Sequence, residues 1–333
     1  MIKVENLIKK YGNHVAVDNL SFEVKKGQIF GFLGPNGAGK TTTMNIMTGY
    51  IAATDGTVEI NGFDILTKPE EAKKCIGYLP EIPPLYSDMT VMEYLRFVAE
   101  LKKVPKEERN AQIQEIMQMT EILDVEGRLI KNLSKGYKQR VGLAQAIIGY
   151  PDVIILDEPM VGLDPKQIIE IRALIKKLSK NHTIILSSHI LSEVSTLCDH
   201  IMIISNGKLM ASDTPQGLQK LMEKSIEIEI VAMGSKEKAE EILGKIKYIQ
   251  SYSCEISEED NDNVKINVLT EENMDIRKEL SVALTGGGMP VLSMNKMEKS
   301  LEDIFLQLTE APEQENPETD NDSEDNVKKQ EEE

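Results

Sequence analysis

The chain has 333 residues, 41% of them hydrophobic, so it is long enough for one large domain or two ordinary ones with a sizeable core. Its formal net charge of −17 argues against a nucleic acid partner held by overall electrostatic attraction. Residues 311–333 hold ten acidic and two basic side chains and so carry −8 of this charge, which leaves the rest of the chain only moderately acidic.

The cysteines and the apolar segments favour a cytoplasmic protein. Cys75, Cys198 and Cys254 lie far apart without metal-ligand spacing, as expected of reduced thiols. The first residues lack the apolar core of a signal peptide, and no apolar run approaches the 18 residues that a membrane span needs. We therefore expect any membrane role to depend on a partner.

Residues 1–217 are predicted to form an α/β domain with a largely parallel, buried sheet, because short β-type runs alternate with helical segments. Residues 153–156 and 183–186 are continuous apolar runs, as expected of strands covered on both faces. The β-type runs lie at residues 4–11, 20–24, 28–34, 57–60, 75–80, 153–159, 183–189 and 201–209.

A mainly helical subdomain is expected within this domain, at about residues 85–150. Thr90 and Glu93 have the T-x-x-E spacing of a capping box, which opens one helix. Pro105 suits the first turn of the next helix, since its missing N–H group costs nothing there.

A second, α+β unit is predicted over residues 222–310, after a turn at residues 214–220. Its order of strand, helix, strand, strand, helix and strand is that of the ferredoxin-like split βαβ arrangement. A last helix follows. These elements are expected at residues 226–232, 236–246, 249–256, 263–269, 273–284, 290–296 and 298–308.

The acidic tail, residues 311–333, has almost no apolar side chains and cannot offset the entropy lost on ordering. We expect it to be disordered, and a solubilising role is the simplest one for it.

A phosphate-binding loop is predicted at GPNGAGKTT, residues 34–42, because it follows an apolar strand and precedes a helical segment. Its glycines let the backbone wrap closely around phosphate oxygens. Lys40 is expected at the β and γ phosphates of a nucleotide, and the Thr41 hydroxyl at Mg²⁺. The loop residues are Gly34, Pro35, Asn36, Gly37, Ala38, Gly39, Lys40, Thr41 and Thr42.

Two adjacent carboxylates, Asp157 and Glu158, end the apolar run at residues 153–156. Ligands gather at the carboxyl ends of strands in open parallel sheets. We expect Asp157 to hold Mg²⁺ through water and Glu158 to polarise an attacking water molecule.

A second helix N-terminus suited to an anion lies in LSKGYKQR, residues 133–140. Ser134 can cap this helix, and Gly136 follows closely, so backbone N–H groups are free to hold a phosphate. Capping of its own helix is a structural role of Ser134 that is compatible with this one.

These motifs together resemble those of the nucleotide-binding subunits of ATP-binding cassette (ABC) transporters, over residues 1 to about 217. LSKGYKQR is similar to the signature sequence of that family, GLDP (162–165) to its D-loop, and SSH (187–189) to its switch histidine. Tyr11 resembles the aromatic residue that stacks on adenine. The resemblance implies a P-loop ATPase fold, with ATP and Mg²⁺ as cofactors.

The resemblance also implies how the site works. Two such subunits pack head to tail, so that Ser134 and Gly136 of one contact the γ phosphate bound to the other. Glu158 takes a proton from water, His189 contacts the γ phosphate, and Asp164, an N-cap before Pro165, serves communication between the sites. The implied nucleotide contacts are Tyr11, residues 34–42, Ser134, Gly136 and Asp164, and the implied metal ligands are Thr41, Glu81 and Asp157.

Three positions depart from the family pattern. Glu81 replaces the usual Q-loop glutamine, and a carboxylate can still bind Mg²⁺ although it adds a charge and loses a donor. In the signature, Lys135 stands where a glycine is common and Tyr137 where a glutamine is common. Ser134 and the second glycine are kept, so we expect their phosphate contacts to survive.

The segment LPEIPPLYSDMTVMEYL (79–95) and the closing SLEDIFLQLTE (300–310) resemble the drug-resistance and gliding-type branch of bacterial exporters. The resemblance implies an ATPase at the cytoplasmic face of the membrane, bound to membrane-spanning subunits through about residues 81–130 and to a second ATP-binding subunit.

The alternative is a soluble ABC-type ATPase that acts as a switch in DNA repair or on ribosomes. About ninety residues separate the phosphate loop from the signature, which is too few for a long coiled coil, and a single cassette is present. A weaker alternative is a sensor whose ATPase is regulated through the C-terminal unit.

Overall fold

A computed structural model describes residues 1–221, 226–256, 262–271 and 274–297 of the chain. The predicted helix at 298–308 and the acidic tail lie outside the described residues. None of the helices described within those ranges is long and apolar enough to cross a membrane.

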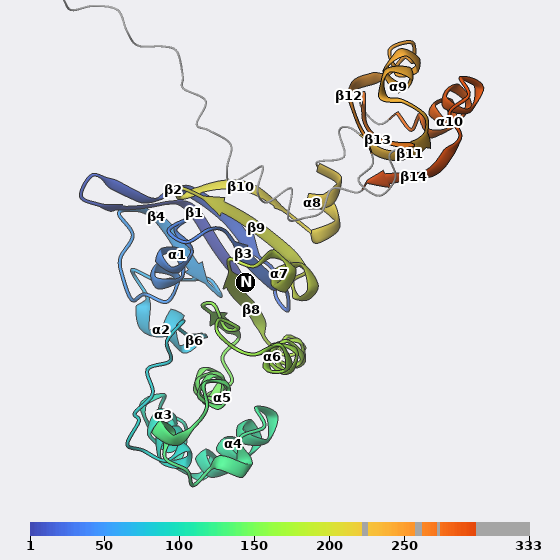
Figure 1. Cartoon of the computed structure of the whole chain (residues 1–333). Coiled ribbons are helices and arrows are strands. Elements are labelled where there is room, and N and C mark those ends of the chain that lie inside the picture. The colour runs from blue at the N-terminus through green and yellow to red at the C-terminus, as the bar shows by residue number, and fades with distance from the viewer. Residues whose placement is uncertain (222–225, 257–261, 272–273, 298–333) are drawn as a thin grey trace, which may run out of the picture.

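A six-stranded sheet with the order β10-β9-β3-β8-β7-β6 forms the centre of residues 1–221 (Figure 1). All neighbouring pairs are parallel except β9 and β10, which pair antiparallel. The predicted run 201–209 is therefore two strands, separated by the Asn206–Gly207 turn. The strands are β3 (Ile29–Leu33), β6 (Ile76–Leu79), β7 (Val153–Leu156), β8 (Thr183–Ser188), β9 (His200–Ser205) and β10 (Lys208–Asp213).

The prediction of one largely parallel sheet was wrong for the first strands, which form a separate antiparallel sheet of order β2-β1-β4-β5. The turn between β1 and β2 has only two residues, Gly12 and Asn13, and such a short connection joins antiparallel strands. The strands are β1 (Ile2–Tyr11), β2 (His14–Val24), β4 (Asp55–Ile60) and β5 (Phe63–Asp64).

Helices cover the six-stranded sheet, and α3, α4 and α5 gather on the side away from β1 and β2 (Figure 1). Thr90 and Glu93 form the predicted capping box at the start of α3. Residues 215–220 of the segment 214–220, predicted as a turn, belong to a helix. The helices are α1 (Lys40–Met47), α2 (Pro69–Lys74), α3 (Val91–Leu101), α4 (Lys106–Met119), α5 (Lys135–Ile147), α6 (Pro165–Leu178), α7 (Leu191–Leu197) and α8 (Pro215–Leu221), with 3₁₀ turns at Leu123–Val125 and Ile130–Asn132.

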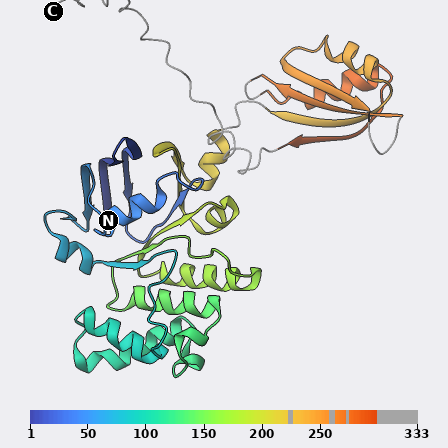
Figure 2. The ribbon, with the colours of Figure 1, turned by 60° about the vertical axis from the view of Figure 1, so that its left-hand side comes forward.

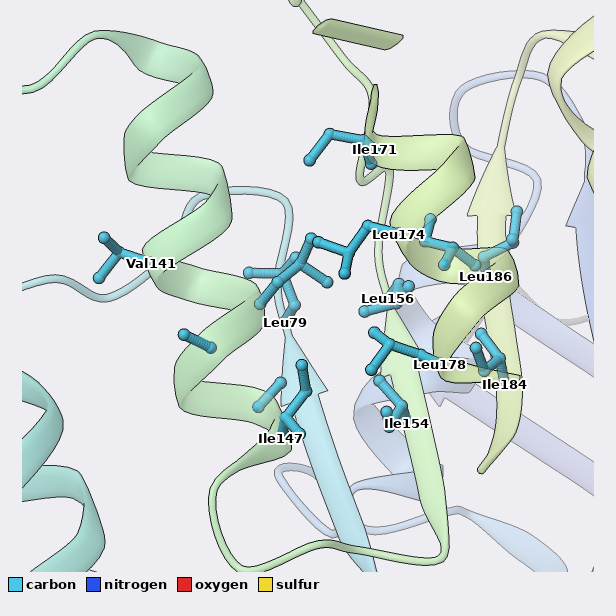
Figure 3. Packing of buried hydrophobic residues seen from close by; sticks show 14 of the residues in the cluster. Leu79, Val141, Ile147, Ile154, Leu156, Ile171, Leu174, Leu178, Ile184 and Leu186 are labelled. Carbon is cyan, nitrogen blue, oxygen red and sulfur yellow. The ribbon is translucent and has the colours of Figure 1, made fainter. Parts of the chain in front are cut away.

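The continuous apolar runs pack on both faces of the sheet, as the sequence predicts. Ile154 and Leu156 of β7 join a cluster with α5 and α6, in which side chains from sheet and helices point toward one another (Figure 3). Val153 and Ile155 join a second cluster on the opposite face, with residues of the antiparallel sheet and α1. Because both faces of the sheet are buried, polar side chains reach a cleft at the ends of the strands.

The C-terminal unit is a four-stranded antiparallel sheet of order β12-β13-β11-β14, covered on one face by α9 and α10 (Figure 2). Alternate residues of β11 and β13 are buried beneath these helices. The elements are β11 (Glu227–Met233), α9 (Lys236–Leu243), β12 (Ile249–Ile256), β13 (Asn263–Thr270), α10 (Arg277–Gly286) and β14 (Val291–Met297).

Candidate functional site

A cleft of about 370 Å³ lies at the carboxyl ends of the parallel strands. It brings together Tyr11 from the first hairpin, most of the predicted phosphate loop, and side chains that follow three strands. Its lining residues are Tyr11, His14, Ala16, Asn36, Gly37, Ala38, Gly39, Lys40, Thr41, Thr42, Glu81, Glu158, Val161 and His189.

The loop before α1 needs its glycines for close backbone approach. Gly39 has φ +100°, and a Cβ there would lie 2.5 Å from the carbonyl oxygen of Ala16. A Cβ on Gly34 would lie 2.3 Å from the carbonyl oxygen of Ile204. Gly39 is the N-cap of α1 and has no side chain to cap it. The first N–H groups of α1 therefore have no intrahelical acceptor, which suits an anion.

Lys40 is buried at the base of the cleft. Its Nζ donates to the carbonyl oxygens of Gly34 at 2.7 Å and Pro35 at 3.1 Å, and lies 3.6 Å from Oε1 of Glu158. Burial lowers the pKa of Lys40, and the negative charge of Glu158 opposes this shift. Gly34 and Pro35 themselves do not line the cleft and instead hold this ammonium group through their carbonyls.

Asp157 follows β7 and is almost completely buried. Its Oδ1 accepts from the hydroxyl of Ser187 at 2.6 Å and from the hydroxyl of Thr41 at 3.3 Å. Burial raises the pKa of Asp157, while the two hydroxyl donors lower it. The structure thus places two of the three predicted magnesium ligands, Asp157 and Thr41, in direct contact.

Glu158 links the phosphate loop to the strand end of β8. Its Oε1 lies 3.6 Å from Lys40 Nζ and its Oε2 lies 3.0 Å from Nδ1 of His189. The backbone of Glu158 has φ +47°, a left-handed conformation that is uncommon for residues other than glycine. Strained backbone of this kind concentrates at functional sites.

The rim of the cleft holds Glu81 and the first hairpin. Glu81 is exposed just beyond β6, and its negative charge partly opposes the lowering of the Lys40 pKa by burial. Tyr11 is half exposed, with Lys9 Nζ 5.1 Å from its ring centroid. His14 pairs with Tyr11 across the hairpin and also lines the cleft. It was not predicted as a site residue, although the two-residue turn between them could have indicated that His14 lies beside Tyr11.

The signature residues lie outside this cleft. Ser134 caps α5 by accepting from the N–H of Tyr137 at 3.4 Å, and Gly136 packs against Gln167. They line a separate pocket of about 280 Å³. Asp164 is likewise outside the cleft and caps α6 through the N–H of Gln167 at 2.9 Å.

The two departures in the signature have defined positions. The Tyr137 hydroxyl donates to Asp124 at 2.8 Å, which ties the first turn of α5 to the 3₁₀ turn after α4. The Lys135 ammonium packs against Gly162, where an added Cβ would lie 2.1 Å from Nζ. Lys135 therefore covers the GLDP loop.

Comparison with known proteins gives consistent matches. A family described as ABC transporter matches residues 17–161. The bacitracin transport ATP-binding protein BcrA of Bacillus licheniformis is 36% identical over 310 residues, covering 92% of this chain and 97% of the relative. The linearmycin resistance ATP-binding protein LnrL of Bacillus subtilis is 30% identical over 310 residues, covering 93% and 98%.

Solved structures agree with the sequence matches. An ATP-binding cassette solved as a dimer in a post-hydrolysis state, bound to ADP and Pi, has a TM-score of 0.59 with 26% identity. The match covers 65% of this chain and 99% of that chain. An ATP-binding subunit of an ABC transporter has a TM-score of 0.61 with 29% identity, covering 66% and 92%.

Proposed function

The chain belongs to the family of ABC transporter ATP-binding proteins and is an ATPase of that family, and from this premise we propose that it powers a membrane exporter. The observation that carries the proposal is the similarity to BcrA, which spans 92% of this chain and therefore extends into the C-terminal unit. Relatives named for transport or resistance support an exporter rather than a soluble switch.

ATP is assigned to the cleft, with its phosphates over residues 36–42 and its base toward Tyr11. The backbone N–H groups of the loop and of the first turn of α1 would hold the phosphates, and Lys40 would add its charge. The Lys40 ammonium group donates to two carbonyls of its own loop and lies 3.6 Å from the Glu158 carboxylate. Phosphates would compete with Glu158 for this ammonium group.

The residues present fit Mg²⁺. Thr41, Asp157 and Glu81 offer oxygen ligands, which Mg²⁺ prefers. Among the described residues no group of three or more His, Cys, Asp or Glu side chains could hold a metal alone. Mg²⁺ commonly takes one or two carboxylates from a protein and completes its shell with phosphate and water. When bound, it would neutralise charge on the phosphates.

Glu158 is the proposed general base. It is buried and lies within hydrogen-bond reach of His189, so its carboxylate is held in one orientation in the cleft. It would accept the proton of the attacking water, while His189 would contact the γ phosphate and orient the attack. Lys40 and the N-terminus of α1 would stabilise the negative charge of the transferring phosphoryl group.

A second ATP-binding subunit is proposed as a partner, either a copy of this chain or a relative. Ser134 and Gly136 form a helix N-terminus in a pocket of their own, away from Lys40, so they are free to contact a phosphate bound elsewhere. The related cassette solved as a dimer supports this arrangement. Asp164 would then relay between the two sites.

The Glu158→Gln protein is expected to dimerise in saturating Mg-ATP, because bound ATP that is not hydrolysed links two subunits. Light scattering after size-exclusion chromatography measures this, with nucleotide-free protein as the control. Adding Ser134→Ala should shift the dimer toward monomer, since the helix loses its hydroxyl contact to the phosphate. A strictly monomeric Glu158→Gln protein in Mg-ATP would contradict the proposed dimer.

The membrane-spanning subunit is proposed to dock on the surface formed between β6 and the end of α3, at the cytoplasmic face of the membrane. Ile82, just beyond β6, and Leu101, the last residue of α3, are large apolar residues exposed at 82% and 63%. A cleft of about 800 Å³ adjoins Leu101 and α2. It is lined by Pro69, Glu70, Lys73, Lys74, Ile76, Leu101, Lys102, Lys103, Ile148, Gly149 and Pro151.

Purification of tagged Glu158→Gln protein from detergent-solubilised membranes tests the exporter proposal. We expect mass spectrometry to recover a multi-spanning membrane protein with it. Recovery only from the soluble fraction, with ribosomal or DNA-repair proteins, would overturn the transport role while leaving the ATPase intact.

Ile82→Asp and Leu101→Asp are each expected to reduce recovery of this membrane protein several-fold, because a charge in an apolar contact must be desolvated. ATPase activity of the isolated subunit measures whether the fold survives. Met233→Asp, at an exposed apolar residue of the C-terminal unit, is the matched control. Equal recovery by all three variants would place the docking surface elsewhere.

The domain division is proposed as residues 1–217 for the ATPase, 222–310 for the accessory unit and 311–333 for the acidic tail. The sheet order β12-β13-β11-β14 with both helices on one face supports a ferredoxin-like arrangement of the accessory unit.

A further inference from the structure

We propose that Ser187 is a positioning residue that holds the two site carboxylates, Asp157 and Glu158, through one buried hydroxyl group. The inference rests on the proposed hydrolysis mechanism, in which these carboxylates act on magnesium and water. Nothing in that mechanism uses Ser187 directly.

The hydroxyl of Ser187 uses both of its hydrogen-bonding abilities within the site. Ser187 lies in β8, and its side chain is completely buried. Its Oγ donates to Oδ1 of Asp157 at 2.6 Å and accepts from the backbone N–H of Glu158 at 2.8 Å. A single hydroxyl thus fixes the side chain of one carboxylate and the backbone of the next.

The backbone of Glu158 needs such a partner. The N–H of Asp157 still donates to the carbonyl of Leu79 at 2.8 Å, as in the sheet. The chain then leaves the sheet, since Glu158 adopts φ +47°. Its buried N–H would be unsatisfied without an acceptor at this point. The Ser187 hydroxyl supplies that acceptor and so stabilises the conformation that places the Glu158 carboxylate between Lys40 and His189.

The register of the parallel strands β7 and β8 explains why Ser187 can reach both carboxylate residues. β7 and β8 pair with Leu156 opposite Leu186, so Ser187 reaches the level of Asp157 where β7 ends. The neighbouring Ser188 is equally buried, but its hydroxyl donates to Glu193 at 2.7 Å and accepts from the N–H of Ile190 at 3.0 Å. Ser187 therefore contacts the two carboxylate residues of the site, whereas Ser188 contacts the first turn of α7.

Ser187→Ala is expected to lower kcat for ATP hydrolysis roughly 10- to 100-fold with KM for ATP changed less than about threefold, because the base is misplaced while the phosphate loop is intact. Ser187→Thr keeps the hydroxyl and should restore kcat to within about threefold of wild type. Wild-type kcat in Ser187→Ala, or equal loss of kcat in a folded Ser187→Thr, would overturn the inference.

Thr183→Val is the control for losing a buried hydroxyl on the same strand. Thr183 is buried, and its hydroxyl accepts from the N–H of Gly27 at 3.0 Å, away from the carboxylates. Thr183→Val should lower the melting temperature without changing kcat. A kcat loss in Thr183→Val equal to that in Ser187→Ala would mean that the effect is general destabilisation.

A double-mutant cycle with Glu158→Gln isolates the link to the base. Ser187→Ala should cost little further turnover in the Glu158→Gln background, and an undiminished cost there would overturn action through Glu158. If Glu158→Gln alone hydrolyses ATP at the wild-type rate, the proposed mechanism fails instead, whatever Ser187→Ala does.

Calorimetric ATP binding gives a readout independent of turnover. In the Glu158→Gln background, Ser187→Ala should leave binding of ATP in EDTA unchanged and reduce the gain in affinity on adding Mg²⁺ by roughly two- to threefold. An unchanged magnesium effect would overturn the assigned contact to Asp157.

Discussion

Replacing Glu158 by Gln is expected to lower kcat for ATP hydrolysis by roughly 10²- to 10⁴-fold, the usual contribution of a general base. Glutamine has nearly the same size and can keep a hydrogen bond to His189, whose Nδ1 lies 3.0 Å from Oε2 of Glu158. It cannot accept the proton of the attacking water. ATP affinity should stay within about threefold, because the phosphate loop is unchanged. Steady-state phosphate release and calorimetric ATP binding measure the two quantities.

Glu193→Gln is the matched control, since Glu193 is another buried carboxylate near the end of the same sheet. Its Oε2 accepts from the hydroxyl of Ser188 at 2.7 Å, and a glutamine oxygen can do the same. We expect its kcat within about threefold of wild type. Turnover by Glu158→Gln at a similar rate would show that the base lies elsewhere.

Lys40→Met is expected to weaken ATP binding roughly 10- to 100-fold, because a hydrogen bond to a charged group contributes about 1.5–3 kcal/mol. Lys40 is the lysine that lines the cleft, and its ammonium group is held by two carbonyls of the same loop. Methionine keeps the apolar length of the side chain without the charge. Binding of a fluorescent ATP analogue at fixed Mg²⁺ measures the loss.

Lys102→Met separates loss of charge from loss of fold. Lys102 also donates to backbone carbonyls, those of Gln145, Ala146 and Ile148, at the end of α5. Burial lowers the pKa of Lys102 to about 8. Its removal should lower the melting temperature and leave ATP affinity unchanged. Equal loss of ATP affinity in both variants would attribute the Lys40 effect to destabilisation.

Much of the fold follows from local patterns. The α/β P-loop ATPase fold that the motifs imply is confirmed by the solved cassettes. The apolar runs of β7 and β8 indicated strands buried on both faces, and they pack in two clusters. The predicted turn at residues 214–220 is instead mostly helix, at Pro215–Leu221. In the structure the Thr214 hydroxyl accepts from the N–H of Gly217 at 3.0 Å and Pro215 opens the helix.

The sequence did not predict which strands belong to which sheet. The runs that became β1, β2 and β4 have the composition of strands, and composition does not say which neighbour a strand pairs with. Their antiparallel pairing beside the six-stranded sheet depends on the short hairpin and on apolar faces that meet residues of β3, such as Phe30 and Phe32.

In the candidate site, too, local sequence predicts the residues that are close together in the chain. Residues 34–42 act through the backbone of one continuous loop, so spacing within the sequence determines them. Asp157 and Glu158 are adjacent, and a strand end predicts their place.

The sequence by itself therefore determined the phosphate loop, the paired carboxylates and the helix caps, because each depends on neighbours within a few residues. Only the tertiary structure decided which distant groups meet. The register of β7 against β8 brings Ser187 to Asp157 across 30 positions. The same packing separates Ser134 from Lys40, since α5 begins in a different pocket. Contacts between distant segments depend on how sheets and helices pack, which no local pattern specifies.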